Sequence, residues 1–156
     1  MNGIVTLPDD RLSYISHKND GNYLIIHMES VEERAKCPYC GKVSYKVHSH
    51  YTRKLQDLPI QAKKVKLVIN IKKFFCLNKN CEHKTFAESY SFFDPKATKT
   101  KRLQEEILKV SLTQSSLSAA QYLRSGVADV GKSTICNLLK KTRETCRENR
   151  CNCSLH

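Results

Sequence analysis

Two cysteine pairs decide the fold of this chain. The first is Cys37-Pro38-Tyr39-Cys40-Gly41, a C-x2-C pair, and the second is Cys76-Leu77-Asn78-Lys79-Asn80-Cys81, a C-x4-C pair; 35 residues separate Cys40 from Cys76. Each short spacing lets two sulfurs of one turn reach the same ion, and Zn²⁺ favours four tetrahedral ligands, with thiolate well suited. The pairs therefore predict one structural zinc ion held by Cys37, Cys40, Cys76 and Cys81, as in a zinc ribbon.

The sequence also offers alternative ligands for this ion. His83 lies close enough to Cys81 in sequence to replace it, and His48 and His50 are weaker candidates, because a histidine in a basic strand usually faces solvent. Cys151-Asn152-Cys153 with His156 can form a second site, although a solvated tail is the better interpretation. Since a four-ligand structural site is coordinatively closed, we expect no catalysis there, and we expect a chelator to unfold residues 37–93.

The residues around the cysteine pairs are typical of β-strands. Val43, Tyr45 and Val47 alternate with polar residues. Val65, Leu67, Ile69 and Ile71 alternate with a set that is mostly lysine but includes Val68, so each of the two apolar sets is expected to point inward. The step Asp57-Leu58-Pro59 is expected to break the chain between these strands. Upstream, Asn19-Asp20-Gly21 marks a turn, which predicts a hairpin formed by residues 11–16 and 23–28.

The last third of the chain is predicted to be helical. Leu103, Ile107 and Val110 recur at the spacing of one helix face, and Ser118 with Gln121 has the spacing of a capping box. A third helix is expected over residues 132–143. A helix at 118–124, a turn containing glycine and a helix beginning near Gly131 together match a helix-turn-helix, whose alternative is an ordinary three-helix bundle with a solvated basic face.

The same turn formally matches a phosphate-binding loop. Residues 126–133 read Gly-Val-Ala-Asp-Val-Gly-Lys-Ser, which fits G-x4-G-K-[S/T]. In nucleotide hydrolases that loop follows a buried strand, whereas residues 118–124 are predicted to be helical. We therefore expect no ATP or GTP binding.

The charge of the chain favours a polyanionic partner. The 156 residues contain 27 Lys and Arg against 15 Asp and Glu, a net charge of +12. Residues 1–34 carry 3 basic and 6 acidic side chains, residues 35–93 carry 12 and 3, and residues 94–156 carry 12 and 6, so all of the excess follows Arg34. Clustered Lys and Arg of this kind are typical of nucleic-acid binding, with a solvated basic surface as the alternative.

Composition also excludes several classes of protein. The apolar runs are far shorter than the ~20 residues that span a bilayer, and the first ten residues lack the basic and apolar regions of a secretory signal. We therefore expect a cytoplasmic protein that does not enter a membrane, in a compartment where thiols stay reduced.

Three blocks of sequence resemble a known family. Cys37-Pro38-x-Cys40-Gly41, then His48-Ser49-x-Tyr51-Thr52-Arg53-Lys54-Leu55-x-Asp57-Leu58-Pro59, and then Lys72-Lys73-Phe74-Phe75-Cys76-x4-Cys81-x3-Thr85-Phe86-Ala87-Glu88 are similar in order and spacing to the N-terminal part of ISL-three family insertion-sequence transposases. The resemblance covers about residues 10–143. It implies a zinc ribbon and a helix-turn-helix that recognise DNA at element ends.

The family also carries a catalytic domain, and this chain departs from that pattern. In the family, an RNase H-like domain with an Asp-Asp-Glu metal site performs strand transfer, and this sequence reaches His156 before any such domain. We therefore expect a truncated transposase that recognises terminal inverted repeats without catalysing strand transfer.

The predicted organisation is an α+β fold with a small β-rich ribbon followed by three helices. It comprises a strand or hairpin segment (1–36), the zinc ribbon (37–93), a linker (94–100), the helix-turn-helix (101–143) and a polar tail rich in Cys and Arg (144–156). Phosphates and bases are expected to contact a set of basic and polar side chains: Arg53, Lys54, Lys64, Lys66, Lys72, Lys132, Ser133, Asn137, Lys140 and Lys141.

The expected partner is double-stranded DNA. A full-length transposase is a second expected partner, because a chain of this kind would occupy element ends and inhibit it. A homodimer would suit paired ends, although no heptad pattern supports one. The competing hypotheses are an active enzyme, which would need an acidic metal site that the scattered carboxylates do not form, and a zinc ribbon that binds protein or RNA.

Overall fold

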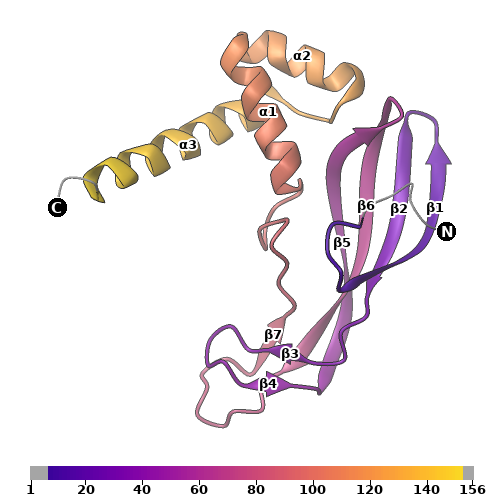
Figure 1. The fold of residues 1–156 in the computed structure, drawn as a ribbon, viewed down its shortest axis with the longest axis vertical. Coiled ribbons are helices and arrows are strands. Elements are labelled where there is room, and N and C mark those ends of the chain that lie inside the picture. The colour runs from indigo at the N-terminus through magenta and orange to yellow at the C-terminus, as the bar shows by residue number, and fades with distance from the viewer. Residues whose placement is uncertain (1–6, 153–156) are drawn as a thin grey trace.

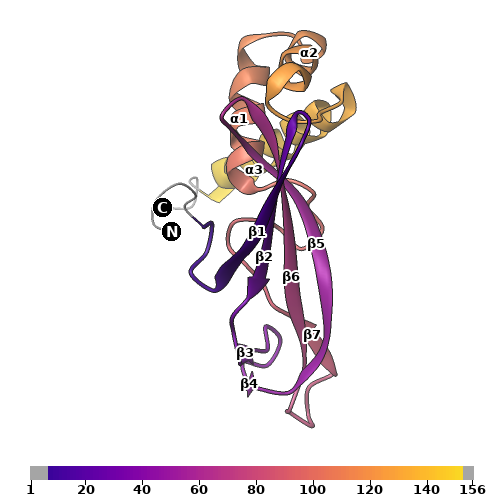
Figure 2. The ribbon, with the colours of Figure 1, turned by 90° about the vertical axis from the view of Figure 1, so that its right-hand side faces the viewer.

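The helices lie at one end of the molecule and the small β-sheet lies at the other, while the strands of the large sheet run between them and reach the helices (Figures 1 and 2). The computed structural model describes residues 7–152, with side chains placed as far as residue 145. A five-stranded sheet, a two-stranded sheet and three helices confirm the α+β class predicted from the sequence. Within the described residues, no helix has the length and apolar character needed to cross a membrane.

The strands of the large sheet lie in the order β1 (Leu12–Asp20), β2 (Tyr23–Ser30), β6 (Lys63–Phe75) and β5 (Val47–Ile60), and the short β7 (Thr85–Ala87) also pairs with β6. β2 and β6 run parallel, and the other neighbours are antiparallel. The small sheet pairs β3 (Ala35–Lys36) with β4 (Val43–Ser44).

The predicted N-terminal hairpin is present as β1 and β2. Its turn contains Gly21, whose φ of +56° belongs to the left-handed region that glycine adopts at little cost. β2 then pairs with β6 over residues 23–29 and 64–70, so the N-terminal segment shares a sheet with the strands that follow the first cysteine pair. The predicted boundary at residue 36 thus separates strands that share one hydrophobic core.

β5 and β6 form a long hairpin that carries most of this core. Val65, Leu67, Ile69 and Ile71 are at most 3% exposed, as their alternation predicts. The predicted break at Asp57-Leu58-Pro59 is wrong, because β5 continues to Ile60 and the hairpin turns at Gln61 and Ala62. Pro59 lies where the register of β5 against β6 shifts, between Asp57 and Ile60. β5 can contain a proline there because it is an edge strand of the sheet.

The strand predicted at Val43–Val47 has the opposite orientation. Val43, Tyr45 and Val47 are 48%, 75% and 38% exposed, whereas Ser44 is fully buried and its Oγ accepts a hydrogen bond from the Lys46 amide at 3.2 Å. β4 is only two residues long and adjoins a cysteine turn, so the packing of that turn, rather than the apolar pattern, sets which side chains point inward.

Residues 88–93 cover the apolar face of the large sheet. Tyr90 and Phe93 pack on the core strands and are each 6% exposed. The buried Glu88 fixes this segment, since its carboxylate accepts hydrogen bonds from the Ser30 hydroxyl at 2.6 Å and from the Lys72 amide at 2.7 Å. A buried carboxylate needs such donors because desolvation is otherwise costly.

Three helices follow, namely α1 (Lys101–Thr113), α2 (Ser116–Gly126) and α3 (Lys132–Asn152). Leu103, Ile107, Leu123 and Ile135 are fully buried in their shared core, and Val110 packs against it. The start predicted for α2 is wrong, because Ser115 is its N-cap and accepts a hydrogen bond from the Ser118 amide. α3 also continues past the predicted end at residue 143, since no glycine or proline interrupts the sequence up to residue 152.

The segment predicted as a linker, residues 94–100, lies against the edge of β5. The Gln56 amide donates to the Thr98 carbonyl at 2.9 Å, and the Thr100 amide donates to the Gln56 carbonyl at 3.0 Å. Arg53 also donates to the Ala97 carbonyl at 2.7 Å. These bonds hold the start of α1 beside β5.

Candidate metal centre and nucleic-acid interface

The first cysteine pair lies in a tight turn between β3 and β4. The Cys37 amide donates to the Lys42 carbonyl, and the Gly41 amide donates to the Cys37 carbonyl, both at 2.9 Å. Gly41 has a φ of +75°, which explains why a glycine follows the pair. The turn brings the sulfurs of Cys37 and Cys40 to the same side.

The second pair forms a corresponding turn between β6 and β7. The Cys76 amide donates to the Lys84 carbonyl at 2.8 Å, and the Cys81 amide donates to the Asn78 carbonyl at 3.1 Å. The two extra residues of the C-x4-C spacing are accommodated by Asn78, whose side-chain oxygen accepts from the Asn80 amide at 3.1 Å.

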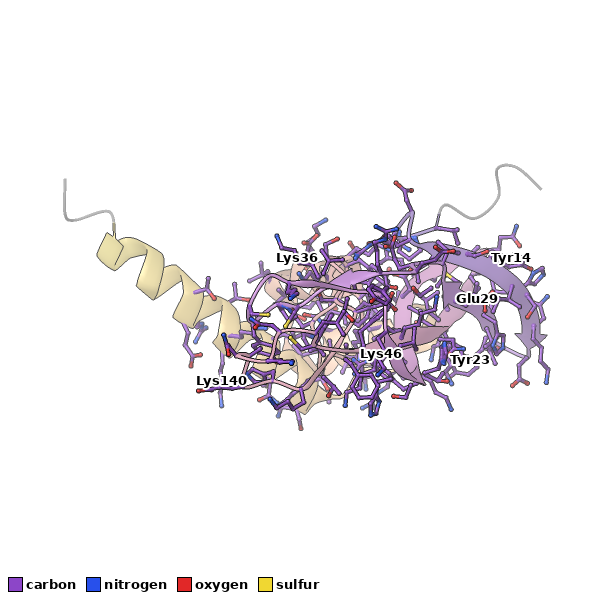
Figure 3. All side chains as sticks on the ribbon, turned by 90° about the horizontal axis from the view of Figure 1, so that it is seen from below. Tyr14, Tyr23, Glu29, Lys36, Lys46 and Lys140 are labelled. Carbon is purple, nitrogen blue, oxygen red and sulfur yellow. The ribbon has the colours of Figure 1, made fainter. Side chains whose placement is uncertain are left out.

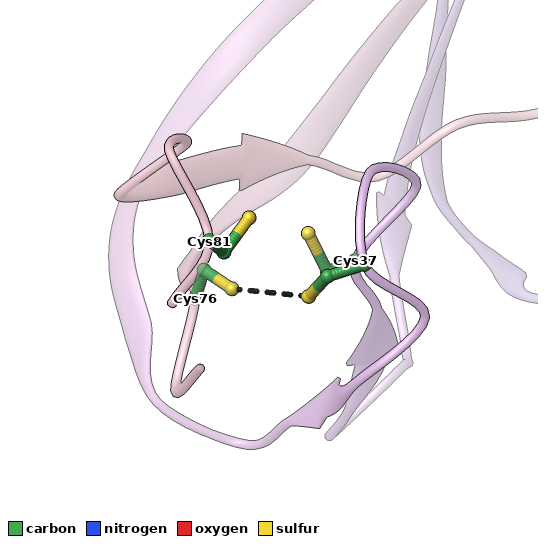
Figure 4. Close-up of side chains that lie close together, drawn as sticks. Cys37, Cys76 and Cys81 are labelled. Carbon is green, nitrogen blue, oxygen red and sulfur yellow. Dashed lines mark hydrogen bonds between the residues drawn. The ribbon is translucent and has the colours of Figure 1, made fainter. Parts of the chain in front are cut away.

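The two turns face each other and bring four sulfurs together (Figure 4). The sulfurs of Cys37, Cys40, Cys76 and Cys81 all lie within 4.8 Å of one another, and those of Cys40 and Cys76 are 3.5 Å apart. Ligands about 2.3 Å from a tetrahedral zinc ion would be about 3.8 Å apart. The cluster can therefore bind one zinc ion, as the spacing predicts.

Backbone amides favour negative charge on the sulfurs of Cys40 and Cys76, and burial opposes it. The Lys42 amide donates to the Cys40 sulfur and lowers the pKa of that thiol to about 6. The Asn78 amide acts on Cys76 in the same direction, but desolvation and its cysteine neighbours prevail and raise the pKa of Cys76 to about 12. Burial likewise raises the pKa of Cys81. A bound Zn²⁺ ion would supply the positive charge that stabilises all four thiolates.

A small core supports the cluster and excludes His83 from it. Cys37, Phe74, Cys81 and Phe86 are buried together. The His83 ring instead stacks on the Tyr39 ring, with centroids 3.4 Å apart, so it links the two turns from outside. Cys136 lies on α3, away from the cluster, and the side chains of Cys146, Cys151, Cys153 and His156 lie outside the described residues.

Most of the predicted phosphate contacts on the sheet have partners within the protein. Arg53 binds the Ala97 carbonyl and lies over the Phe93 ring, and the Lys72 ammonium donates to the Glu32 carbonyl at 2.7 Å. The Lys66 ammonium lies 3.8 Å from the centroid of the Tyr23 ring. Lys54, by contrast, is exposed. The alternating sequence of β6 therefore predicts that its lysines lie on the face opposite the core, but it does not predict that their partners lie within the protein.

Lys64 joins the sheet to the turn between α2 and α3. Its ammonium forms an ion pair with Asp129 at 2.7 Å, and the Tyr23 hydroxyl donates to the same carboxylate at 2.7 Å. Although burial alone would raise the pKa of Asp129, these two hydrogen bonds lower it below its usual value. The Asp129 amide also donates to the Gln56 side chain at 2.9 Å.

Asp57 is a second junction between sheet and helices that sequence reasoning missed. It is 2% exposed, and its carboxylate accepts hydrogen bonds from the Thr100 hydroxyl and the Arg102 Nε, each at 2.7 Å, and from Arg102 Nη2. The sequence shows only an aspartate before Leu-Pro, a pattern that predicts a chain break. Its distance in sequence from Thr100 and Arg102 leaves no local pattern to detect.

The predicted residues on α3 lie on its exposed side. Lys132, Ser133, Asn137, Lys140 and Lys141 are all exposed, and Lys140 lies where α3 leads away from the sheet (Figure 3). Among them only Lys141 has an ion-pair partner within the described residues, Asp94 at 3.7 Å. Such an exposed pair is weak and leaves the lysine available.

The comparison with protein families places the metal centre in a known class. The cysteine cluster, two facing turns and hairpin strands define a zinc ribbon. Residues 33–81 match the family model described as the zinc-finger of transposase IS204/IS1001/IS1096/IS1165. This match confirms the resemblance for the ribbon. No curated protein and no solved structure matches the chain.

Proposed function

We propose that this chain is a DNA-binding protein related to transposases, in which α2 and α3 form a helix-turn-helix and α3 enters the major groove. The transposase zinc-ribbon match supports a DNA-binding role of this kind. The observation that carries the proposal is the two-sided character of α3. One side packs into the helical core through Ile135, and the other exposes lysines and an asparagine to solvent.

The geometry of α3 suits base recognition. Ser133, Asn137 and Lys140 follow one another at spacings of four and three residues, so they lie on one side of the helix. An α-helix fits the major groove, where asparagine reads adenine and lysine reads guanine. Lys132 and Lys141 flank this row and would neutralise phosphates.

The contacts to the sheet would hold this helix in a defined direction. Asp57 fixes the start of α1 through Thr100 and Arg102, and Asp129 fixes the turn before α3 through Lys64 and Tyr23. Because Asp57 and Lys64 both lie within four residues of the turn of the β5–β6 hairpin, the sheet serves as a base for the helices. We propose that Lys64 and Arg53 contribute to DNA binding indirectly, because Lys64 holds the turn before α3 and Arg53 holds the segment before α1.

Charge reversal on α3 tests the proposal. Lys140→Glu should abolish binding to target duplex, and Lys109→Glu, an exposed lysine on α1, is the matched control. Each lysine that contacts a phosphate should contribute about −0.9 to the slope of log Kobs against log salt concentration. If Lys140→Glu binds duplex DNA as the unmodified chain does, α3 is not the reading helix.

We further propose that the target is the terminal inverted repeat of an insertion sequence, and that the chain binds it without cutting it. In support, the buried carboxylates Asp57 and Glu88 are committed to hydrogen bonds within the fold, so they do not offer free ligands for Mg²⁺. Incubation of the purified chain with supercoiled plasmid and Mg²⁺ should leave the plasmid intact; nicking that co-purifies with the chain would overturn this part.

A chain of this kind would compete with a full-length transposase for element ends. In a strand-transfer assay with a full-length relative, added chain should inhibit in proportion to its occupancy of the repeats. Lys140→Glu should not inhibit. We place this activity in the cytoplasm, where the cluster thiols stay reduced. Light scattering with and without a two-repeat DNA would show whether the chain acts as a dimer.

A further inference from the structure

The part of the molecule around the metal centre presents exposed aromatic rings in a strongly basic setting. We define the ribbon lobe as residues 34–48 and 73–87, which comprises both cysteine turns and the strand ends beside them. It contains seven Lys or Arg residues and one acidic residue, Glu82. Tyr45 is 75% exposed and Tyr39 is 60% exposed.

These rings have no role in the core of the lobe. The buried core consists of Cys37, Phe74, Cys81 and Phe86, whereas Tyr45 points outward because Ser44, its neighbour, points inward. Val43 and Val47 flank Tyr45 and are also exposed. Replacement of a side chain as exposed as Tyr45 should change the stability of the fold little, so packing does not explain its presence.

Basic side chains accompany the aromatic rings. The Lys46 ammonium lies 5.2 Å from the Phe75 ring centroid, and the His48 ring meets the same phenylalanine edge to face at 4.7 Å. Lys36 and Lys42 adjoin the first cysteine turn and are exposed. Rings interleaved with lysines are the arrangement by which proteins bind single strands, with bases stacked on the rings and phosphates held by the cations.

We propose that the ribbon lobe binds single-stranded DNA by stacking unpaired bases on Tyr45 and Tyr39. This inference rests on the proposed DNA-binding function and adds a second site, separate from the duplex-reading face of α3. The charge of the lobe favours a polyanion over a protein surface, and duplex DNA would leave these rings without a base face to cover.

The rigid stack of Tyr39 on His83 makes Tyr39 suited to this role. The two rings are nearly parallel, with an angle of 13° between their planes, and each comes from a different cysteine turn. One face of Tyr39 is therefore occupied by His83. The zinc ion, by fixing both turns, would hold the remaining face in place for a base.

The test measures anisotropy of fluorescein-labelled dT20 with the zinc-loaded full chain. Tyr45→Leu keeps apolar area but removes the ring, and it should raise Kd roughly 5-fold or more, as for the loss of one stacked base. Tyr45→Phe should restore binding. Tyr122→Leu, at a tyrosine on α2 that is 55% exposed, should leave Kd unchanged.

Three further probes separate this site from its alternatives. An abasic 20-mer should bind weakly, because it retains the phosphates but offers no bases. Duplex binding should survive Tyr45→Leu and be lost with Lys140→Glu, so failure of the ribbon site and failure of the α3 proposal give different patterns. Unchanged dT20 affinity in Tyr45→Leu, equal affinity for the abasic strand, or tighter binding of rU20 would overturn the proposal.

Discussion

Removal of zinc should unfold the ribbon lobe and leave the rest of the chain folded. β3 and β4 are two residues each and β7 is three, so the lobe has few backbone hydrogen bonds of its own. Structural zinc sites in small domains bind with about 10–16 kcal/mol, which is as large as the whole stability of a typical domain. The lobe should therefore not persist without the ion.

The larger sheet should survive, because its core is separate. Ten buried residues, among them Ile26, Leu55 and Ile69, form one cluster, and the buried residues around the cysteines form another. β6 is paired on both sides by β2 and β5 over its central residues. We therefore expect a chelator to unfold the ribbon lobe alone, and not all of residues 37–93 as the sequence predicts.

Hydrogen exchange resolves the two regions. After chelation, the amides of Cys37, Cys76 and Cys81, which donate to carbonyls within the two turns, should exchange freely. The amides of β6 between Val65 and Ile71 should keep their protection. Cys76→Ser should behave as the chelated chain does, and Cys136→Ser, a cysteine outside the cluster, should bind one zinc ion per chain and exchange normally.

If the Cys37 and Cys76 amides stay protected once elemental analysis shows the metal to be gone, zinc does not hold the lobe together. Loss of protection throughout β6 would instead show that the two cores fold as one unit.

Three other changes test the remaining parts of the structure. Asp57→Asn should destabilise the chain by about 1–3 kcal/mol in urea unfolding, because it weakens the charge-assisted bonds of a buried carboxylate; an unchanged midpoint would show that the junction contributes nothing. Ala62→Gly should stabilise by about 0.5–1 kcal/mol, because Ala62 has a φ of +60° that glycine adopts more easily; a loss of stability would show that the turn is not strained. The fold lowers the pKa of Asp129, so its carboxylate should add to the free energy of unfolding at pH values above 3.8, the ordinary pKa, and this addition should be lost as the pH falls below that value. Asp129→Asn should flatten that part of the pH profile of stability. An unaltered profile would contradict the junction with Lys64.

The metal centre could be predicted from the sequence because its determinants are local. Each cysteine pair lies within one turn, and the requirement of a single ion brings the two turns together without knowledge of the intervening fold. Gly41 marks one of the turns through its positive φ. The sequence could not decide whether Cys81 or His83 is the fourth ligand, because the position of His83 depends on its stacking on Tyr39 from the other cysteine turn.

The strand orientations could be predicted only where a strand is long. Along β6 four buried positions alternate over seven residues, and the pattern is decisive. At Val43–Val47 the same pattern fails, because a two-residue strand follows the geometry of its cysteine turn. A parallel pairing of β2 with β6 has no local sequence signature at all, so the shared sheet was missed.

The roles of the basic residues could not be separated by sequence. Lys64, Lys66 and Lys140 look equivalent as charges, yet two of them find partners at Asp129 and Tyr23 and the third remains exposed. The difference comes from contacts between residues more than 40 positions apart. For the same reason Asp57, which holds the helices through Arg102, looked like a mere chain break.

The central claim is that this chain recognises a particular DNA sequence through α3. The most direct measurement incubates the zinc-loaded chain with sheared genomic DNA from its source and sequences the retained fragments, with Lys140→Glu in parallel. We predict enrichment of short inverted repeats that flank a mobile element, and loss of that enrichment in the variant. Retention without enrichment, no retention, or equal enrichment by Lys140→Glu would contradict the claim.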